Sequence, residues 1–319
     1  MNESIPVFEA RNIVKHYAKH VALDDVSISV PAQSILGLLG PNGAGKTSLI
    51  RIINQITAPD SGTVLINGEP LKREHIEVIG YLPEERGLYK KMKIGEQAIY
   101  LAQLKGMPKA EAKSELKRWF KKFEIEGWWS KKVEDLSKGM AQKIQFITTI
   151  IHKPKLLILD EPFSGFDPIN ANLIKNEIME LRENGATIIL STHNMESVEE
   201  ICSHMALINK SKKILGGEVK KIKESFSKNQ YKIEFKGNMV AFANAVWGGW
   251  EMLEKEELNK DHFLVHVKLN DGVELKNYLK GLLEAVDVLS FNKVTLSMNE
   301  IFIKMVNENS SQENTQENE

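Results

Sequence analysis

The chain has 319 residues, and its 42 lysines and arginines nearly balance 43 aspartates and glutamates, which gives a net charge of −1. This balance argues against a protein that binds nucleic acid along its whole length. Cys202 is the only cysteine, which excludes an intrachain disulfide and favours a reducing compartment. No apolar run approaches the roughly 18 residues of a membrane span, and the N-terminus lacks the layout of a signal peptide. We therefore expect a cytoplasmic protein that reaches the inner face of the cell membrane only through a partner.

The N-terminal segment alternates apolar and polar residues in a way that is typical of strands. Strands are predicted over 6–14 and 26–30, with a connection over 16–25 between them. Tyr17 lies in that connection, where its ring can stack on an adenine. A single tyrosine in a loop more often serves packing, so both interpretations stay open at this point.

A glycine-rich loop between a predicted strand and a predicted helix is the strongest motif of the chain. After an apolar strand over 35–39, the residues match GxxxxGK[ST] without a mismatch and lead into a helix at Ser48; they are Gly40, Pro41, Asn42, Gly43, Ala44, Gly45, Lys46 and Thr47. Glycines let backbone N–H groups curl around a polyphosphate, and the helix directs its partial positive end at the same anion. Lys46 can reach the β- and γ-phosphates, and the Thr47 hydroxyl can ligate Mg²⁺. The motif predicts a nucleotide site.

The following segment predicts two short strands and then a helical insert. The strands cover 63–67 and 77–82, and apolar residues at helical spacing predict helices over 94–104 and 109–123. The whole insert spans about 92–135. Trp128 and Trp129 near its end either close the core of the insert or form a contact patch for a partner. The lysines of this region are interpreted as a solvated face; they are Lys121, Lys122, Lys131 and Lys132.

Downstream, chemically active residues again follow predicted strands. Residues 136–140 open a helix for which Ser137 is a suitable N-cap, and an apolar strand over 155–160 ends in Asp160 and Glu161. A helix over 169–182 and a buried strand over 186–191 come next, and His193 lies just beyond that strand. Apolar strands separated by helices predict an α/β fold with a mainly parallel sheet, which binds ligands at the carboxyl ends of its strands.

We assign distinct tasks in phosphoryl transfer to the side chains at that edge. Asp160 is expected to hold Mg²⁺, Glu161 to polarise the attacking water, and His193 to donate a hydrogen bond to the γ-phosphate. Together with Lys46, the glutamate and the histidine form the predicted catalytic set. An Asp-Glu pair at the end of a strand can also be an ordinary turn, but a phosphate loop upstream makes that interpretation less favourable.

The C-terminal third restarts the pattern. We place a domain boundary after residue 226 and interpret 227–306 as β-α-β-β-α-β, which suggests a small α+β, ferredoxin-like domain followed by a last helix. Residues 307–319 contain no apolar side chain, so we expect a disordered polar tail.

In their order, these motifs resemble the ATP-binding cassette (ABC) subunit of a membrane transporter over about residues 7–224. The resemblance rests on 40–47, on Ser137 and Gly139 within 136–140, and on 156–161 and His193. It implies a phosphate-loop NTPase cassette that binds ATP and Mg²⁺ and has antiparallel N-terminal strands. It also implies two partners: a second copy of the chain, which completes a nucleotide sandwich, and an integral membrane permease. The segment 298–304 is similar to the C-terminal extension of bacterial exporter subunits, including the sodium-efflux type.

Further roles follow from the resemblance alone. It implies that Tyr17 stacks on adenine and that Glu84 occupies the Q-loop position beside Mg²⁺. It implies that Ser137 and Gly139 hold the γ-phosphate bound to the other subunit. Glu84 replaces the usual glutamine, and Lys138 and Met140 depart from the usual LSGGQ.

Two other classes of function remain as alternatives. A soluble ABC-type ATPase that acts on ribosomes or DNA is disfavoured by the single cassette, by the lack of a long heptad run and by the balanced charge. A C-terminal domain that senses a ligand is compatible with the transporter interpretation.

Overall fold

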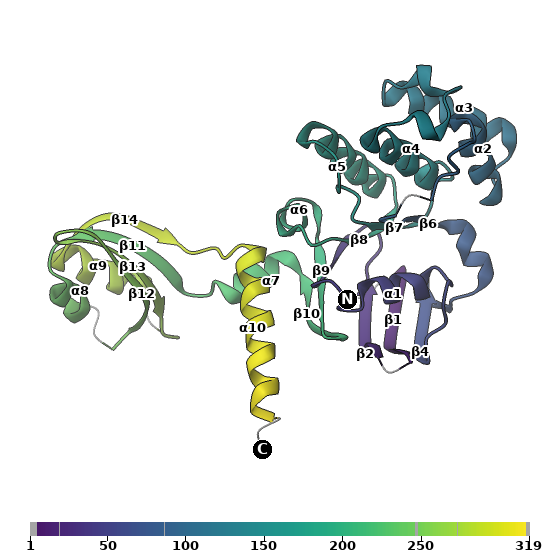
Figure 1. Ribbon diagram of the computed structural model, residues 1–319. Helices are drawn as coiled ribbons and strands as arrows, with labels where there is room; N and C mark the ends of the chain where they lie inside the picture. Colours follow the sequence, from purple (N-terminus) through teal and green to yellow (C-terminus); the bar gives the residue numbers. More distant parts are fainter. Residues whose placement is uncertain (1–4, 19, 86, 246–247, 273, 317–319) are drawn as a thin grey trace. The chain divides into compact units, whose positions relative to one another are not determined.

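The computed structural model describes residues 5–18, 20–85, 87–245, 248–272 and 274–316. The chain forms two compact units, of which one comprises the residues up to Val219 and those from Phe302 onward, and the other is Lys220–Ile301 (Figure 1). Our predictions for the first four residues and for 317–319 lie outside the described part.

A six-stranded sheet forms the centre of the first unit, in the order β10-β9-β3-β8-β7-β6. Its strands are β3 (Ile35–Leu39), β6 (Ile79–Leu82), β7 (Leu156–Asp160), β8 (Thr187–Ser191), β9 (His204–Asn209) and β10 (Lys212–Glu218). All neighbours are parallel except β10, which is antiparallel to β9. Every residue of β3, β7 and β8 is buried, because both faces of these strands are covered. The predicted α/β class with a mainly parallel sheet is confirmed.

A second, antiparallel sheet has the order β2-β1-β4-β5, and β2, β1 and β4 run side by side in Figure 1. Its strands are β1 (Phe8–Tyr17), β2 (His20–Val30), β4 (Ser61–Ile66) and β5 (Glu69–Pro70). The long connection predicted over 16–25 is wrong, because β1 continues to Tyr17, which pairs with His20. Register shifts along β1 break the period-two pattern, and this concealed the hairpin from the sequence.

The helices between residues 46 and 201 include those of the predicted insert. They are α1 (Lys46–Ile53), α2 (Ile94–Leu104), α3 (Lys109–Lys122), α4 (Lys138–Ile150), α5 (Pro168–Glu183) and α6 (Met195–Ile201), with short 3₁₀ turns at Arg73–Val78, Glu126–Trp128 and Val133–Asp135. Trp129 packs edge-on against Phe120, with ring centroids 5.6 Å apart, so its ring belongs to the insert's own core. Lys122 does not lie on a purely solvated face, because it forms ion pairs with Glu177 and Glu180 of α5.

The second unit has the topology of a ferredoxin-like domain. After α7 (Val219–Phe226) come β11 (Gln230–Lys236), α8 (Met239–Ala245), β12 (Trp250–Asn259), β13 (His262–Leu269), α9 (Leu275–Ala285) and β14 (Asp287–Lys293). The strands are antiparallel in the order β12-β13-β11-β14, and α8 and α9 cover one face (Figure 1). Phe242 of α8 stacks on Phe235 of β11 at 4.5 Å between ring centroids.

The last helix, α10, spans Met298–Gln316. The predicted disorder from residue 307 is therefore wrong for 307–316, where the helix continues. Glutamate and glutamine are good helix formers, and extending an existing helix costs far less than starting one. An apolar periodicity was therefore not needed for these residues to be helical.

Candidate nucleotide site

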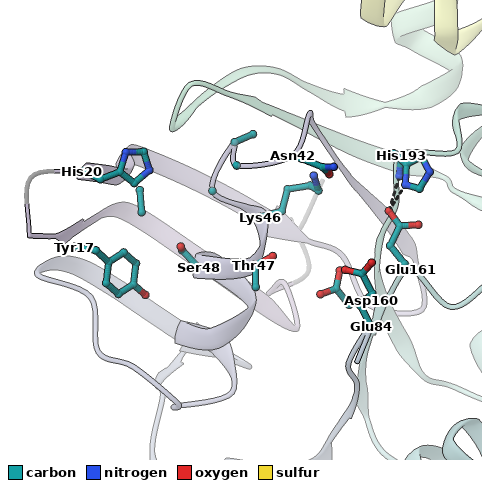
Figure 2. A pocket seen from close by; sticks show the side chains of 14 residues that line it. Tyr17, His20, Asn42, Lys46, Thr47, Ser48, Glu84, Asp160, Glu161 and His193 are labelled. Atoms are coloured by element: carbon teal, nitrogen blue, oxygen red, sulfur yellow. Dashed lines mark hydrogen bonds and ion pairs between the residues drawn. The ribbon is translucent and has the colours of Figure 1, made fainter. Parts of the chain in front are cut away.

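A cavity of about 460 Å³ in the first unit brings together most of the predicted site residues. The side chains in Figure 2 come from the β1–β2 hairpin, from the phosphate loop after β3, and from the ends of β6, β7 and β8. The residues that line the cavity are Tyr17, His20, Ala22, Asn42, Gly43, Ala44, Gly45, Lys46, Thr47, Ser48, Glu84, Asp160, Glu161 and His193. The carboxyl ends of the parallel strands thus meet at one edge, as their order in the sheet requires.

The backbone of the phosphate loop needs glycine at defined positions. Gly45 immediately precedes α1 and has a φ of 116°. A Cβ atom there would lie only 2.3 Å from the carbonyl oxygen of Ala22, so the loop and the hairpin strand are in direct contact. Gly43 has a φ of 80°, and a Cβ on it would meet no atom within 4 Å. The loop therefore presents open backbone to the cavity, which suits a polyphosphate.

Lys46 lies at the start of α1 and turns back over the loop. Its Nζ donates hydrogen bonds to the carbonyl oxygens of Gly40 at 2.6 Å and Pro41 at 3.0 Å. Burial lowers the pKa of Lys46, while the carboxylates of Glu161, Asp160 and Glu84 act in the opposite direction. Gly40 and Pro41 are not among the cavity-lining residues; their carbonyls instead hold the lysine in place.

The carboxylates opposite Lys46 are oxygen donors that could hold a cation. Burial raises the pKa of Asp160, and the nearby carboxylates of Glu84 and Glu161 add to that rise. Within the described ranges, no group of three or more His, Cys, Asp or Glu side chains is arranged to hold a metal ion by itself. Mg²⁺ is commonly bound through one or two protein oxygens together with substrate phosphates. The hydroxyl of Thr47 and the carboxylate of Asp160, both at the cavity, fit that kind of site.

Glu161 and His193 contact each other directly, as the dashed lines in Figure 2 show. Glu161 Oε1 lies 2.6 Å from His193 Nδ1 and accepts a hydrogen bond from the His193 backbone N–H at 2.9 Å. Glu161 Oε2 accepts a third bond, from the hydroxyl of Thr192 at 3.1 Å. The backbone of Glu161 is left-handed, with a φ of 48°, a strained conformation that often marks functional positions. The end of β8 thus fixes the carboxylate that follows β7.

The hairpin supplies the far end of the cavity. Tyr17 is 39% exposed, and Lys15 Nζ lies 5.5 Å from the centre of its ring. His20 also lines the cavity, although no motif of the sequence points to it. His20 pairs with Tyr17 across the β1–β2 hairpin. The sequence could have indicated His20 only if this hairpin had been recognised.

Two predicted binding residues lie elsewhere. Ser137 caps α4, where its hydroxyl accepts a hydrogen bond from the backbone N–H of Met140 at 3.3 Å. Gly139 lies in the first turn of the same helix. Neither residue is among those that line the cavity, so one chain by itself does not bring them to the phosphate loop.

Comparison with known proteins identifies two segments. Residues 23–164 match the family model described as ABC transporter. Residues 217–306 match the model described as ATP-binding protein DrrA1-3-like, C-terminal domain. Among the described residues, no helix is both long and apolar enough to cross a membrane.

Individual relatives agree with the family models. The chain is 46% identical over 222 residues to the uncharacterized ABC transporter ATP-binding protein YhaQ of Bacillus subtilis, and the match covers 70% of this chain and 74% of that protein. It is 33% identical to the Nod factor export ATP-binding protein I of Cupriavidus metallidurans, with coverage of 66% and 71%. A solved structure of an ATP-binding subunit of an ABC transporter superposes with a TM-score of 0.65 and 29% identity, with coverage of 69% and 93%. The chain belongs to the ATP-binding subunits of ABC transporters, which are ATPases.

Proposed function

We propose that this ATPase works as a pair of identical chains that bind two ATP molecules between them and drive a separate membrane permease as an exporter. The observation that carries the proposal is the division of the site. The phosphate loop and the carboxylates share one cavity, whereas Ser137 and Gly139 start α4 outside it. Ser137 is exposed, and the first turn of α4 offers the backbone N–H groups and partial positive charge that suit a phosphate. A second copy would complete the site by bringing these residues to the γ-phosphate.

Within the cavity, each side chain has a role that its position supports. Lys46 neutralises phosphate charge, and Tyr17 stacks on the adenine. Glu161 orients and polarises the attacking water, and His193 both holds Glu161 and donates to the γ-phosphate. Thr47, Asp160 and Glu84 would hold Mg²⁺, which neutralises charge on the phosphate oxygens when bound.

Two substitutions test this assignment. Glu161→Gln keeps the size of the side chain and removes the charge, so we expect ATP binding to persist while turnover falls about 10²- to 10⁴-fold. Lys46→Ala should lose nucleotide binding, as measured by titration with a fluorescent ATP analogue. Near-normal hydrolysis by Glu161→Gln would exclude Glu161 as the group that activates water, and unchanged ATP affinity of Lys46→Ala would refute the phosphate site.

The permease is expected to dock on the insert and on the loop that follows β6. Tyr89 of that loop is 55% exposed, and Tyr100 and Leu104 of α2 are 44% and 62% exposed. Tyr100 and Leu104 are four residues apart, so they share one face of the helix. These apolar side chains suit a partner helix at the membrane surface and would place the chain at the inner face of the membrane.

The export direction is supported by the relative named for Nod factor export. The transported substrate would be recognised by the permease, so the residues of this chain do not specify it. Co-expression with a multi-span membrane protein encoded beside this chain tests the partnership. We expect the two proteins to co-purify in detergent. The variant Leu104→Glu should abolish this co-purification while the isolated chain keeps its ATPase activity. Co-sedimentation with ribosomes instead would favour the soluble alternative.

A further inference from the structure

Strand β6 forms an edge of the six-stranded sheet and ends just before the segment that carries Glu84. Side chains from neighbouring helices hold the backbone carbonyls of this strand. Lys105, at the end of α2, donates to the carbonyl oxygen of Ile79 at 2.9 Å, and Thr149 of α4 reaches that of Tyr81 at 3.5 Å. A Cβ on Gly80 would lie 2.8 Å from the Thr149 carbonyl oxygen, which shows how closely α4 lies against β6.

Gln145 of α4 continues this row beyond the end of the strand. Its Nε2 donates to the carbonyl oxygen of Pro83 at 3.3 Å and to that of Glu85 at 3.1 Å. These two carbonyls flank Glu84, which is itself exposed and lines the nucleotide cavity. One amide group thus holds the backbone on both sides of a single cavity residue.

The burial of Gln145 needs an explanation, because its side chain is in an apolar part of the helix. Gln145 is 5% exposed, and the neighbouring Ile144 and Phe146 are each 1% exposed. A buried amide costs free energy unless it is hydrogen-bonded, and a leucine would fill such a position at lower cost. The two bonds to the loop compensate for this cost, so the amide fits a requirement to hold the loop.

We propose that Gln145 is a positioning residue that fixes Glu84 toward the nucleotide. The inference rests on the role proposed above for Glu84 at the Mg²⁺–phosphate end of the cavity. Without the two bonds, the exposed loop has more conformations, and the Glu84 carboxylate spends less time beside Asp160. Glu84 itself touches the ligand, whereas Gln145 acts only through Glu84.

The same helix also begins with Ser137, eight residues before Gln145, which corresponds to roughly 12 Å of helix. Since α4 is continuous from Lys138 to Ile150, the Glu84 loop and the first turn of α4 are attached to one rigid element. In the proposed dimer, that first turn faces the nucleotide of the other chain. Gln145 therefore links the position of Glu84 in one site to the position of Ser137 in the second.

The test uses the full-length chain and the variant Gln145→Met, which keeps the length of the side chain and removes the donor. ATP affinity is measured with Mg²⁺ and with EDTA, and hydrolysis is measured in parallel. For Gln145→Met we expect about a tenfold lower kcat and a smaller gain in ATP affinity from Mg²⁺, as in Glu84→Ala. The ATP affinity measured in EDTA should stay within about twofold of wild type. Thr148→Val, which removes a buried hydroxyl whose hydrogen bond stays within α4, is the matched control and should behave as wild type.

A double variant separates positioning from general damage to the fold. If Gln145 acts through Glu84, adding Gln145→Met to Glu84→Ala causes no further loss. An additive loss, or a Gln145→Met variant that behaves as wild type while Glu84→Ala does not, overturns the inference alone. A Glu84→Ala variant without effect overturns the proposed role of Glu84 as well. Should Gln145→Met fail to fold, Gln145→Leu, which suits the apolar surroundings, takes its place.

Discussion

Replacing Lys122 with methionine tests the ion-pair cluster that joins the insert to α5. Lys122 Nζ lies 2.8 Å from Glu177 Oε2 and 2.7 Å from Glu180 Oε2. The Glu177 side chain is 5% exposed, whereas that of Lys122 is 33% exposed. Burial raises the pKa of Glu177, and the hydrogen bond and charge of Lys122 oppose that rise. The variant therefore leaves a buried carboxylate whose main compensation has been removed.

The expected loss of stability follows from this geometry. Removing one partner of a fully buried ion pair costs about 3–5 kcal/mol. Because water reaches the lysine end of this pair, we expect a loss of about 2 kcal/mol near pH 7. For a unit of this size, such a loss lowers the melting temperature by about 6 °C.

The pH dependence gives the prediction its specific signature. A carboxyl group whose pKa is raised on folding destabilises the folded protein at high pH. This loss of stability develops as the pH rises from the pKa of the group in the unfolded chain, 4.5 for Glu177, through its pKa in the folded protein. Loss of Lys122 raises the folded pKa further, so the penalty is largest at neutral to alkaline pH and shrinks where Glu177 becomes protonated. Melting curves at about pH 8 and about pH 5 measure this, with the exposed Lys121→Met as control. An equal loss at both pH values, or no loss relative to the control, would refute the reasoning.

Two further predictions concern nucleotide binding. Gly45→Ala should abolish ATP binding and lower the melting temperature, because the added Cβ would lie 2.3 Å from the Ala22 carbonyl oxygen. In Gly43→Ala the added Cβ meets no atom within 4 Å, so this variant should keep more affinity for ATP. Equal ATP affinities of the two variants in a titration would contradict this prediction. Tyr17→Ala should weaken ATP binding about tenfold through lost stacking. Tyr17→Phe should retain wild-type affinity, and a loss below twofold in Tyr17→Ala would exclude stacking.

The sequence predicted the converging edge of the sheet because each group there follows an apolar strand. The phosphate loop follows β3, Asp160 ends β7, and His193 follows β8. Parallel neighbours direct their carboxyl ends to the same side, so chain order and hydrophobicity were sufficient for this prediction. The β-α-β-β-α-β order of the second unit was predicted separately, from apolar periodicities divided by turn residues.

The sequence could not predict features that depend on irregular backbone or on long-range pairs. Register shifts along β1 concealed the hairpin and, with it, His20. Lys122 looked like one of several surface lysines, because its partner Glu177 lies 55 residues away on another helix. Residues 307–316 lack apolar side chains, yet they extend a helix that starts at Met298.

The contacts that tune the site are set by the register between strands. Asp160 of β7 pairs with Ser191 of β8, so the residues that follow them, Glu161 and Thr192, lie next to each other at the edge of the sheet. That register brings Glu161 beside Thr192 and His193, whose hydrogen bonds hold its carboxylate in place. Hydrophobicity specifies which strands are buried but not which residues lie opposite each other. The position of a candidate carboxylate such as Glu161 can therefore be predicted from its place at the end of a strand, whereas its orientation depends on pairings that only the fold reveals.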